Sequence, residues 1–395
     1  MGDRWSVVSD RISDLNIQYA TRNTKNMNSN SKVKVIVLLL GFFYGIQLHA
    51  QPITVTDVVG REVTIPAPAK RVILGEGRQL ITLSLLVPDP VSIIAGWTGD
   101  FAKSGGLLYE DYRKRFPAID KIPLIGSSGK ETVSTEQIIS LKPDLAIFGA
   151  GSHGPDAKSA DVIRQLEAAG IPIVFIDFRL HPFKNTVPSI EVLGKVLGQK
   201  QKATQFIDFY HRRMNYISGV LARHPDIKKP KVYMEMIRGA VPPGSPGKGN
   251  LGEFIEFVGG NNIGTILPGE VGTLNMEYVI SEQPDVYVAT GIAKPGEEGL
   301  VIGQNVYTNQ TQQSLSKLAS RQVVSPLHAI QQGKVYAMWH LFYDSPLNIA
   351  AVEALAKWTH PELFGKLQPH GVLKEINERF LAVPLKGVYF AELKK

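Results

Sequence analysis

The chain has 395 residues, of which 44% are hydrophobic and 20% are charged, a composition typical of globular proteins and a length sufficient for two related domains. Basic residues exceed acidic residues by seven, but the first 50 residues supply three of these positive charges and no dense basic run follows, which argues against a nucleic-acid-binding protein. Because the sequence contains no cysteine, it offers no disulfide, thiolate metal site, cysteine nucleophile or lipidated cysteine.

The N-terminal segment has the pattern of a secretion signal. Val35–Ile46 is a twelve-residue apolar run that follows two lysines and precedes the small residue Ala50, as in signal peptides. The run is shorter than the about 20 residues that span a bilayer, although a membrane anchor is the alternative. We therefore expect cleavage near Ala50 and a soluble periplasmic chain beginning near Gln51. A start at Met27 instead of Met1 would give a signal of ordinary length.

Short apolar strands alternate with helical segments beyond residue 50, which predicts parallel sheets covered by helices. A β-rich opening spans 53–65. The strands expected in the first half are Arg71–Leu74, Ser92–Ala95, Leu145–Gly149 and Ile173–Asp177. The strands expected in the second half are Lys231–Ile237, Asp285–Ala289 and Lys334–Trp339.

Two blocks of the first half recur, in the same order, in the second half. EQIISLKPDLAIFGAG from Glu136 matches EYVISEQPDVYVATG from Glu277, at an offset of 141 residues. EAAGIPIVFIDFRL, which ends at Leu180, matches AIQQGKVYAMWHLF, which ends at Phe342. A glycine closes a helix in each block, and these glycines, Gly170 and Gly333, are 163 residues apart. Any α/β chain yields some units of this kind, but the shared order predicts two related α/β lobes.

The longest helical pattern lies between the two halves. Apolar residues recur at spacings of three and four from Gln201 to His224, and Pro225 stops the pattern. About 24 residues at 1.5 Å each give a rod of roughly 36 Å, long enough to tie two lobes together. We predict two Rossmann-like three-layer lobes joined by this single long helix. The corresponding division is an N-terminal extension and signal at 1–50, a first lobe at 51–199, the linking helix at 200–225 and a second lobe at 226–395.

Glycine-rich segments of the chain do not complete a nucleotide-binding motif. Gly75-Glu76-Gly77 follows a predicted strand, but Leu80 stands where the third glycine would be. GSSGK at 126–130 and GSPGK at 244–248 lack the spacing of phosphate-binding loops. The sequence also has no GxSxG or HExxH motif, so nothing in it favours a hydrolase or a zinc enzyme.

Four segments carry a family resemblance. They are the opening ITVTDVVGREVTIPAPAKRVI, the block STEQIISLKPDLAI, the long helix at 201–224 and the strand GKVYAM. Together they resemble periplasmic binding proteins for ferric siderophores, haem and cobalamin, from Ile53 to near the C-terminus. The resemblance implies a ligand cleft between the lobes, delivery to an inner-membrane ABC importer, no enzymatic activity and no cofactor. Because one packed helix resists bending, we expect little closure on binding and a cleft largely formed beforehand.

Loops at the carboxyl ends of parallel strands are the expected ligand site. The side chains in these loops that we expect to bind ligand are Arg78, Trp97, His153, Arg179, Arg238, Trp339, His340 and Tyr343. The arginines fit an anionic ligand, since guanidinium donates paired hydrogen bonds to carboxylate or catecholate oxygens. Aromatic rings add apolar contact. Solvated surface arginines and core aromatics are the structural alternative for each residue.

An iron chelate of the ferric siderophore type is the expected ligand, carried by a monomer without a direct protein ligand to the metal. Cobalamin, haem or an oxyanion such as molybdate would suit the same architecture, and Tyr343 or His340 could serve as an axial haem ligand. A metal-chelatase enzyme would need a His/Glu pair in the cleft, which the sequence does not show. A secreted adhesion module would need repeats or low-complexity tracts.

Glu136 and Glu277 hold equivalent places in the repeated blocks. The family resemblance implies that a glutamate on each lobe docks among arginines of the permease subunits. Acidic residues at helix starts also interact favourably with the helix dipole, by about 0.3 to 1 kcal/mol, so a purely local role is the alternative.

Overall fold

The computed structural model of the protein describes residues 51–394 except 128, 130, 131, 152, 237–243 and 294–298. The expected signal peptide and Arg238 therefore lie outside the described residues. No helix in the described part is both long and apolar enough to cross a membrane.

The first lobe is built on a parallel sheet, which has five strands among the described residues, in the order β5-β4-β3-β6-β7. The strands are β3 (Val72–Leu74), β4 (Ile94–Thr98), β5 (Leu124–Gly126), β6 (Leu145–Gly149) and β7 (Ile173–Ile176). The antiparallel hairpin that precedes them consists of β1 (Ile53–Thr56) and β2 (Glu62–Ile65). The helices of this lobe are η1 (Gly77–Gln79), α3 (Leu80–Leu86), α4 (Asp100–Ser104), α5 (Leu107–Arg115), η2 (Pro117–Lys121), α6 (Thr135–Ser140), α7 (Ala160–Ala168) and α8 (Pro182–Val196).

The second lobe has a sheet in the order β10-β8-β12-β14-β16, parallel except for the edge strand β16. Its strands are β8 (Lys231–Met236), β10 (Asn261–Asn262), β12 (Val286–Gly291), β14 (Val335–Trp339) and β16 (Phe390–Glu392). Among the described residues, short antiparallel pairs join β9 (Ser245–Pro246) to β11 (Val271–Gly272) and β13 (Gly303–Gln304) to β15 (Gly387–Val388). Its helices are α10 (Leu251–Phe257), η4 (Ile263–Ile266), α11 (Met276–Glu282), α12 (Thr308–Ala319), α13 (His328–Gln331), η5 (His340–Asp344), α14 (Asn348–Thr359), α15 (Pro361–Phe364) and α16 (Pro369–Arg379).

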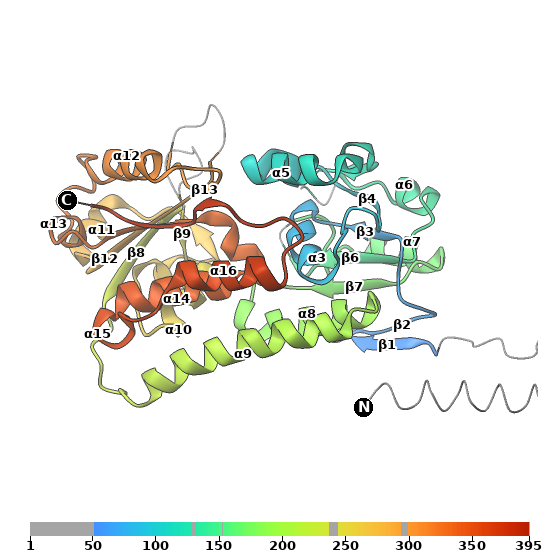
Figure 1. Cartoon of the computed structure of the whole chain (residues 1–395), viewed down its shortest axis with the longest axis horizontal. Helices are drawn as coiled ribbons and strands as arrows, with labels where there is room; N and C mark the ends of the chain where they lie inside the picture. Colours follow the sequence, from blue (N-terminus) through green and yellow to red (C-terminus); the bar gives the residue numbers. More distant parts are fainter. Residues whose placement is uncertain are drawn as a thin grey trace, which may run out of the picture. The chain divides into compact units, whose positions relative to one another are not determined.

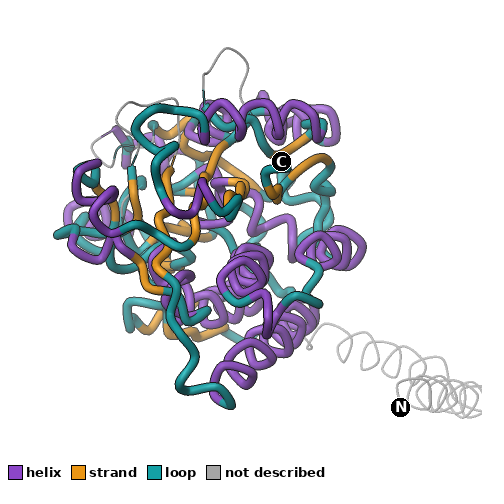
Figure 2. The backbone as a smooth tube through the Cα atoms, turned by 90° about the vertical axis from the view of Figure 1, so that its left-hand side faces the viewer, coloured by secondary structure: helices purple, strands orange, loops and turns teal. Residues whose placement is uncertain are grey.

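Central strands of both sheets are buried on both faces because helices cover them, which explains their nearly continuous apolar sequence. Figure 2 shows helices on the outside and most strands between them. The prediction of two α/β lobes is confirmed.

The blocks that repeat in the sequence fold alike. Ser134 and Asn275, 141 residues apart, cap α6 and α11 by accepting a hydrogen bond from a backbone amide of the first turn. Lys142 and Gln283, also 141 apart, both have left-handed backbone, with φ of 47° and 44°. Matching side-chain caps and matching left-handed residues at the same offset show that the two helix-strand units share their local geometry.

The second repeated block behaves in the same way. Gly170 and Gly333 have φ of 75° and 72°, which places a residue without Cβ at the left-handed end of each helix. The following residues, Ile171 and Lys334, donate to the carbonyl five positions earlier, at 2.9 and 2.8 Å. The chain therefore leaves the helix and enters β7 or β14 by the same turn.

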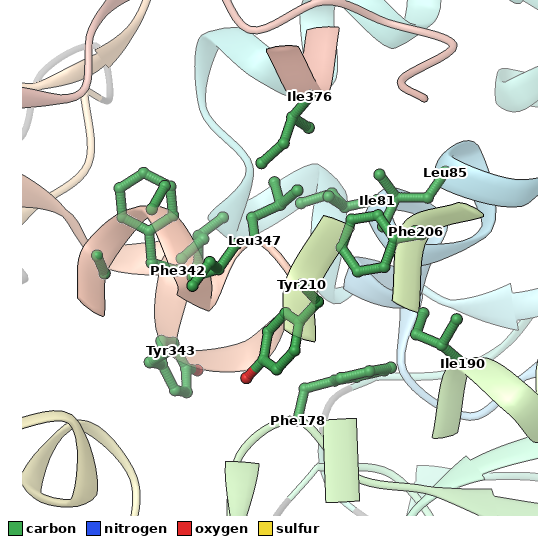
Figure 3. Packing of buried hydrophobic residues seen from close by; sticks show 14 of the residues in the cluster. Ile81, Leu85, Phe178, Ile190, Phe206, Tyr210, Phe342, Tyr343, Leu347 and Ile376 are labelled. Atoms are coloured by element: carbon green, nitrogen blue, oxygen red, sulfur yellow. The ribbon is translucent and has the colours of Figure 1, made fainter. Parts of the chain in front are cut away.

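Helix α9 (Lys200–Ala222) runs along both lobes (Figure 1). It packs against α3 of the first lobe and α14 of the second. Its apolar face, which includes Phe206 and Tyr210, lies in a hydrophobic core that continues through both lobes (Figure 3). Burying a side chain of this size stabilises the fold by about 1.5–3 kcal/mol, so α9 fixes the lobes by packing as well as by connection.

A C-terminal segment forms a second link between the lobes, which the sequence analysis did not anticipate. After α16, the ring of Phe380 packs on Phe206 and Phe209 of α9, with centroids 5.2 and 5.7 Å apart. The amide of Ala382 donates to the carbonyl of Ser84 in α3, at 3.1 Å. The chain then returns to the second lobe as β15 and β16, so this segment restrains the lobes in addition to α9.

Candidate ligand site at the lobe junction

Arg78 is the centre of a buried charged cluster at the junction of the lobes. Its guanidinium forms ion pairs with Glu76, with Asp100 at 3.4 Å and with Asp344 at 3.2 Å. It also donates to the hydroxyl of Tyr343. Each of the four charged side chains is 7% exposed or less. A guanidinium this deeply buried needs charged acceptors, and strand ends of both lobes supply them.

Strand endings explain how these residues meet. Glu76 and Arg78 follow β3, Asp100 follows β4, and Tyr343 and Asp344 follow β14. The carboxyl ends of parallel strands lie at one edge of each sheet, and these edges face each other across the junction. These side chains therefore lie at the carboxyl ends of strands, which is where the sequence predicts a ligand site; that they bind ligand stays a prediction.

The carboxyl group of Glu76 is electrostatically unusual. Burial raises its pKa well above the ordinary value, the nearby Arg78 opposes this shift, and the carboxylates of Asp344 and Asp100 add to it. Glu76 thus holds a proton more readily than an exposed glutamate does.

The Gly75-Glu76-Gly77 turn has a packing role. The amide of Gly77 donates to Asp100 Oδ1 at 2.8 Å and to Thr98 Oγ1 at 3.0 Å. A Cβ atom at Gly77 would lie 2.5 Å from the carbonyl oxygen of Thr98, so no larger residue fits there without a shift. The turn that resembles part of a dinucleotide motif instead brings two strand ends into contact.

Arg179 reaches the junction from the loop after β7. Its Nε lies 3.8 Å from Glu270 Oε2 of the second lobe, and its guanidinium carbon lies 5.4 Å from the ring centroid of Tyr343. Arg78 is at the same distance from that ring, so Tyr343 contacts both cations. Within the described part of the chain, Nε and Nη1 of Arg179 are buried without a hydrogen-bond acceptor.

Asp177 fixes the loop that carries Arg179. One carboxylate oxygen accepts from the amides of Arg179 and Leu180 at 2.8 and 2.7 Å. The other accepts from the amide of His181 at 3.0 Å and from the side chain of Asn185 at 2.6 Å. Four hydrogen bonds to one buried carboxylate make this loop a preorganised support for Arg179.

The other residues predicted to bind ligand lie partly at the junction and partly inside one lobe. His340 contacts the ring of Tyr343, with centroids 4.8 Å apart, and its Nδ1 lies 2.8 Å from Thr290 Oγ1. Trp339 is buried among aromatic rings of its own lobe, with Phe342 and Tyr389 each 5.2 Å away.

Trp97 is buried in the first lobe and stacks on Tyr109 at 6.4 Å. His153 is half-buried after β6. The structure brings Arg78, Arg179, Tyr343 and His340 together, whereas the two tryptophans pack within their lobes.

The predicted ligand-site residues did not include the acidic partners of the arginines. Glu76, Asp100, Asp177 and Asp344 each stand within a few residues of a strand end, which is the signal that could have identified them. The sequence prediction started from an anionic ligand, so it included arginines and aromatic residues but no acidic residue. Within the described residues, no group of three or more His, Cys, Asp or Glu is arranged to hold a metal ion.

Glu136 and Glu277 form a second candidate surface. Both are exposed and lie in the first turn of α6 and α11. One turn later, Ile139 and Ile280 are 37% and 38% exposed. Each lobe therefore presents an acidic and an apolar side chain on the same face of an equivalent helix.

A family model described as a periplasmic binding protein matches residues 98–339 of the chain. Because this match covers more than half of the sequence, the chain belongs to that family of periplasmic binding proteins. The family resemblance read from the four sequence segments is confirmed.

Solved structures and a curated relative agree with this assignment. The TroA-like periplasmic binding protein FepB from Veillonella parvula is 26% identical, with a TM-score of 0.77, and the match covers 87% of this chain and 100% of that one. The molybdate-binding protein MolA from Haemophilus influenzae shares the fold at 19% identity, with a TM-score of 0.61, over 83% of this chain and 97% of that one.

The uncharacterized ABC transporter substrate-binding lipoprotein YvrC from Bacillus subtilis (strain 168) is 29% identical over 157 residues. That match covers 40% of this chain, and the chain spans 43% of that relative's length.

Proposed function

We propose that the protein captures a ferric siderophore between its lobes in the periplasm and delivers it to an inner-membrane ABC importer. The observation that carries the proposal is the meeting of Arg78 and Arg179 from the first lobe with Tyr343 from the second. A ligand held by side chains of both lobes would favour one arrangement of the lobes, which a transporter could recognise. The protein acts as a monomeric carrier without catalysis in this proposal.

Haem is the second candidate ligand. The rings of His340 and Tyr343 lie side by side at the junction, and either type of side chain can ligate haem iron. Cobalamin and an oxyanion such as molybdate are further alternative ligands for the same carrier function. MolA, which shares this fold, binds molybdate.

Docking to the permease is assigned to Glu136 and Glu277. The support is their exposure and their equivalent positions on the two lobes. Two acidic contacts at equivalent positions would set the register of docking even where each exposed pair is weak.

The proposal is tested by native mass spectrometry of the protein isolated from the periplasm, followed by fluorescence titration with ferric chelates, haem and cobalamin. Arg179→Ala should weaken binding of the preferred compound by tens-fold, since an unpaired buried contact costs about 2–5 kcal/mol and each 1.4 kcal/mol is about tenfold. The control is Arg212→Ala, at an exposed arginine of α9. Wild-type affinity in Arg179→Ala would place the site elsewhere, and failure to bind any small molecule would refute the function.

A further inference from the structure

We infer that the lobe junction accepts a neutral or cationic metal chelate that presents one acceptor group to Arg179, and that it disfavours polyanionic chelates. This inference rests on the proposed function and narrows its ligand class. It departs from the expectation, drawn from the arginines alone, of an anionic ligand.

The positive charge of Arg78 is already compensated within the protein. One guanidinium faces the three carboxyl groups of Glu76, Asp100 and Asp344, all nearly inaccessible to solvent. Even if Glu76 holds a proton, as its raised pKa favours, Asp100 and Asp344 still form ion pairs with the same guanidinium. Arg78 therefore adds no uncompensated positive charge that could attract a polyanion.

The second lobe adds further negative charge near Arg179. Glu270 lies 3.8 Å from Arg179 Nε, and Glu253 lies 3.1 Å from Nδ1 of His181, two residues along the same loop. Asp177 beneath this loop is buried and hydrogen-bonded. Among the described residues of this region, carboxyl groups thus outnumber guanidinium groups.

Arg179 nevertheless keeps the ability to bind one acceptor. Its Nε and Nη1 lack a hydrogen-bond acceptor in the described part of the chain, and 3.8 Å is too long for a hydrogen bond to Glu270. The Tyr343 ring and the loop held by Asp177 support the guanidinium in place. A single carbonyl or carboxylate of the ligand would satisfy these donors without bringing excess negative charge.

The test compares two iron complexes of equal metal content: a cationic ferric tris-hydroxamate and a triply anionic ferric tris-catecholate. Isothermal titration of the exported protein should show at least tenfold tighter binding of the hydroxamate complex. Asp344→Asn, which removes one negative charge with little change in shape, should lower this preference severalfold. Glu270→Gln, at a more exposed carboxylate, provides the same test if Asp344→Asn does not fold. Asp161→Asn, at an exposed residue of α7, is the control and should leave the preference unchanged.

Tighter binding of the catecholate complex or of molybdate overturns the inference, and so does binding of neither iron complex. An unchanged preference in both Asp344→Asn and Glu270→Gln also overturns it. The proposed function is judged separately, by stimulation of the reconstituted importer's ATPase with protein loaded from periplasmic extract. Stimulation without hydroxamate binding would retain the carrier function and reject only the ligand class.

Discussion

Arg78 and Asp344 form an ion pair that crosses from one lobe to the other. Nη2 of Arg78 lies 3.2 Å from Oδ2 of Asp344, and the two side chains are 5% and 4% exposed. A buried ion pair adds little net stability over well-packed apolar groups, but loss of one partner leaves the other as an uncompensated buried charge. The pair therefore makes the stability of each lobe's strand ends depend on the other lobe.

Arg78→Met should lower the free energy of unfolding by about 3–5 kcal/mol, because it leaves buried carboxyl groups without their cation. Urea denaturation followed by circular dichroism measures this change. Arg164→Met, at an exposed arginine that pairs with Asp161, is the matched control and should change stability by less than about 1 kcal/mol. A loss in Arg78→Met no larger than in the control would show that Arg78 does not hold the cluster together.

The pH dependence of stability should carry a contribution from Glu76. Burial, offset in part by Arg78, raises its pKa well above the ordinary value of 4.5. The folded state therefore binds this proton more tightly than the unfolded state does. The contribution of Glu76 is fully present below about pH 4.5 and is lost as the pH rises through the raised folded pKa.

Glu76→Gln keeps an uncharged side chain at all pH values, so it should flatten this part of the profile and increase stability relative to wild type on the alkaline side. Denaturation series in buffers from acidic to alkaline pH measure both effects. Glu62→Gln, at an exposed position of β2, should leave the profile unchanged. A profile of Glu76→Gln that runs parallel to wild type would contradict the assignment.

The local signals in the sequence predicted the elements well. The linking helix was expected at 201–224 and is observed at 200–222, because apolar periodicity and a following proline are local features. The strand expected at Ser92–Ala95 lies at Ile94–Thr98 instead. Ser92 is held in a turn, since its amide and hydroxyl bond to Asp89, and an apolar run alone cannot reveal that turn.

Local sequence signals could not predict the charged cluster around Arg78 or the C-terminal crossing between the lobes. Arg78 meets Asp344, 266 residues later, only because the fold brings together residues that follow strands of two different sheets, and no sequence spacing encodes that contact. The segment after α16 contacts Ser84 through its backbone in an irregular conformation, which has no periodic pattern to detect. Side-chain type and strand ends predicted candidate residues, whereas tertiary packing determines which charges compensate one another.

A glycine at the junction supplies a steric test of the lobe contact. Gly106, before α5, has φ of 54° and ψ of −136°, and a Cβ atom there would lie 2.3 Å from the carbonyl oxygen of Ala293 in the second lobe. Gly170 has φ of 75°, and a Cβ atom there would have no neighbouring atom within 4 Å. Both substitutions to alanine carry a backbone cost of about 1–3 kcal/mol, but only Gly106→Ala also pushes against the opposite lobe.

Gly106→Ala should therefore lower the melting temperature more than Gly170→Ala and increase the radius of gyration measured by small-angle scattering. Gly170→Ala should lower the melting temperature while leaving the radius unchanged. Equal effects of the two substitutions would mean that the contact between Gly106 and Ala293 does not restrain the lobes.

The last prediction concerns docking through Glu136 and Glu277. Each lies in the first turn of a helix capped by an equivalent residue, and each has an exposed isoleucine one turn later. A purely local role would be to interact with the helix dipole, worth about 0.3 to 1 kcal/mol per glutamate, and would leave transport unaffected. If the pair docks on the importer, Glu136→Ala/Glu277→Ala should keep the wild-type ligand affinity and reduce stimulation of the importer's ATPase.

The control is Glu191→Ala/Glu256→Ala, which removes two exposed glutamates of α8 and α10 and matches the change in net charge. Because the two double variants differ only in the position of the lost charges, a general effect of charge on association would reduce stimulation equally in both. A specific effect would reduce stimulation in Glu136→Ala/Glu277→Ala alone, with each single variant intermediate, since one remaining contact still orients the protein. Unaltered ATPase stimulation and uptake in Glu136→Ala/Glu277→Ala would refute the docking role and leave these residues with a local role at the helix starts.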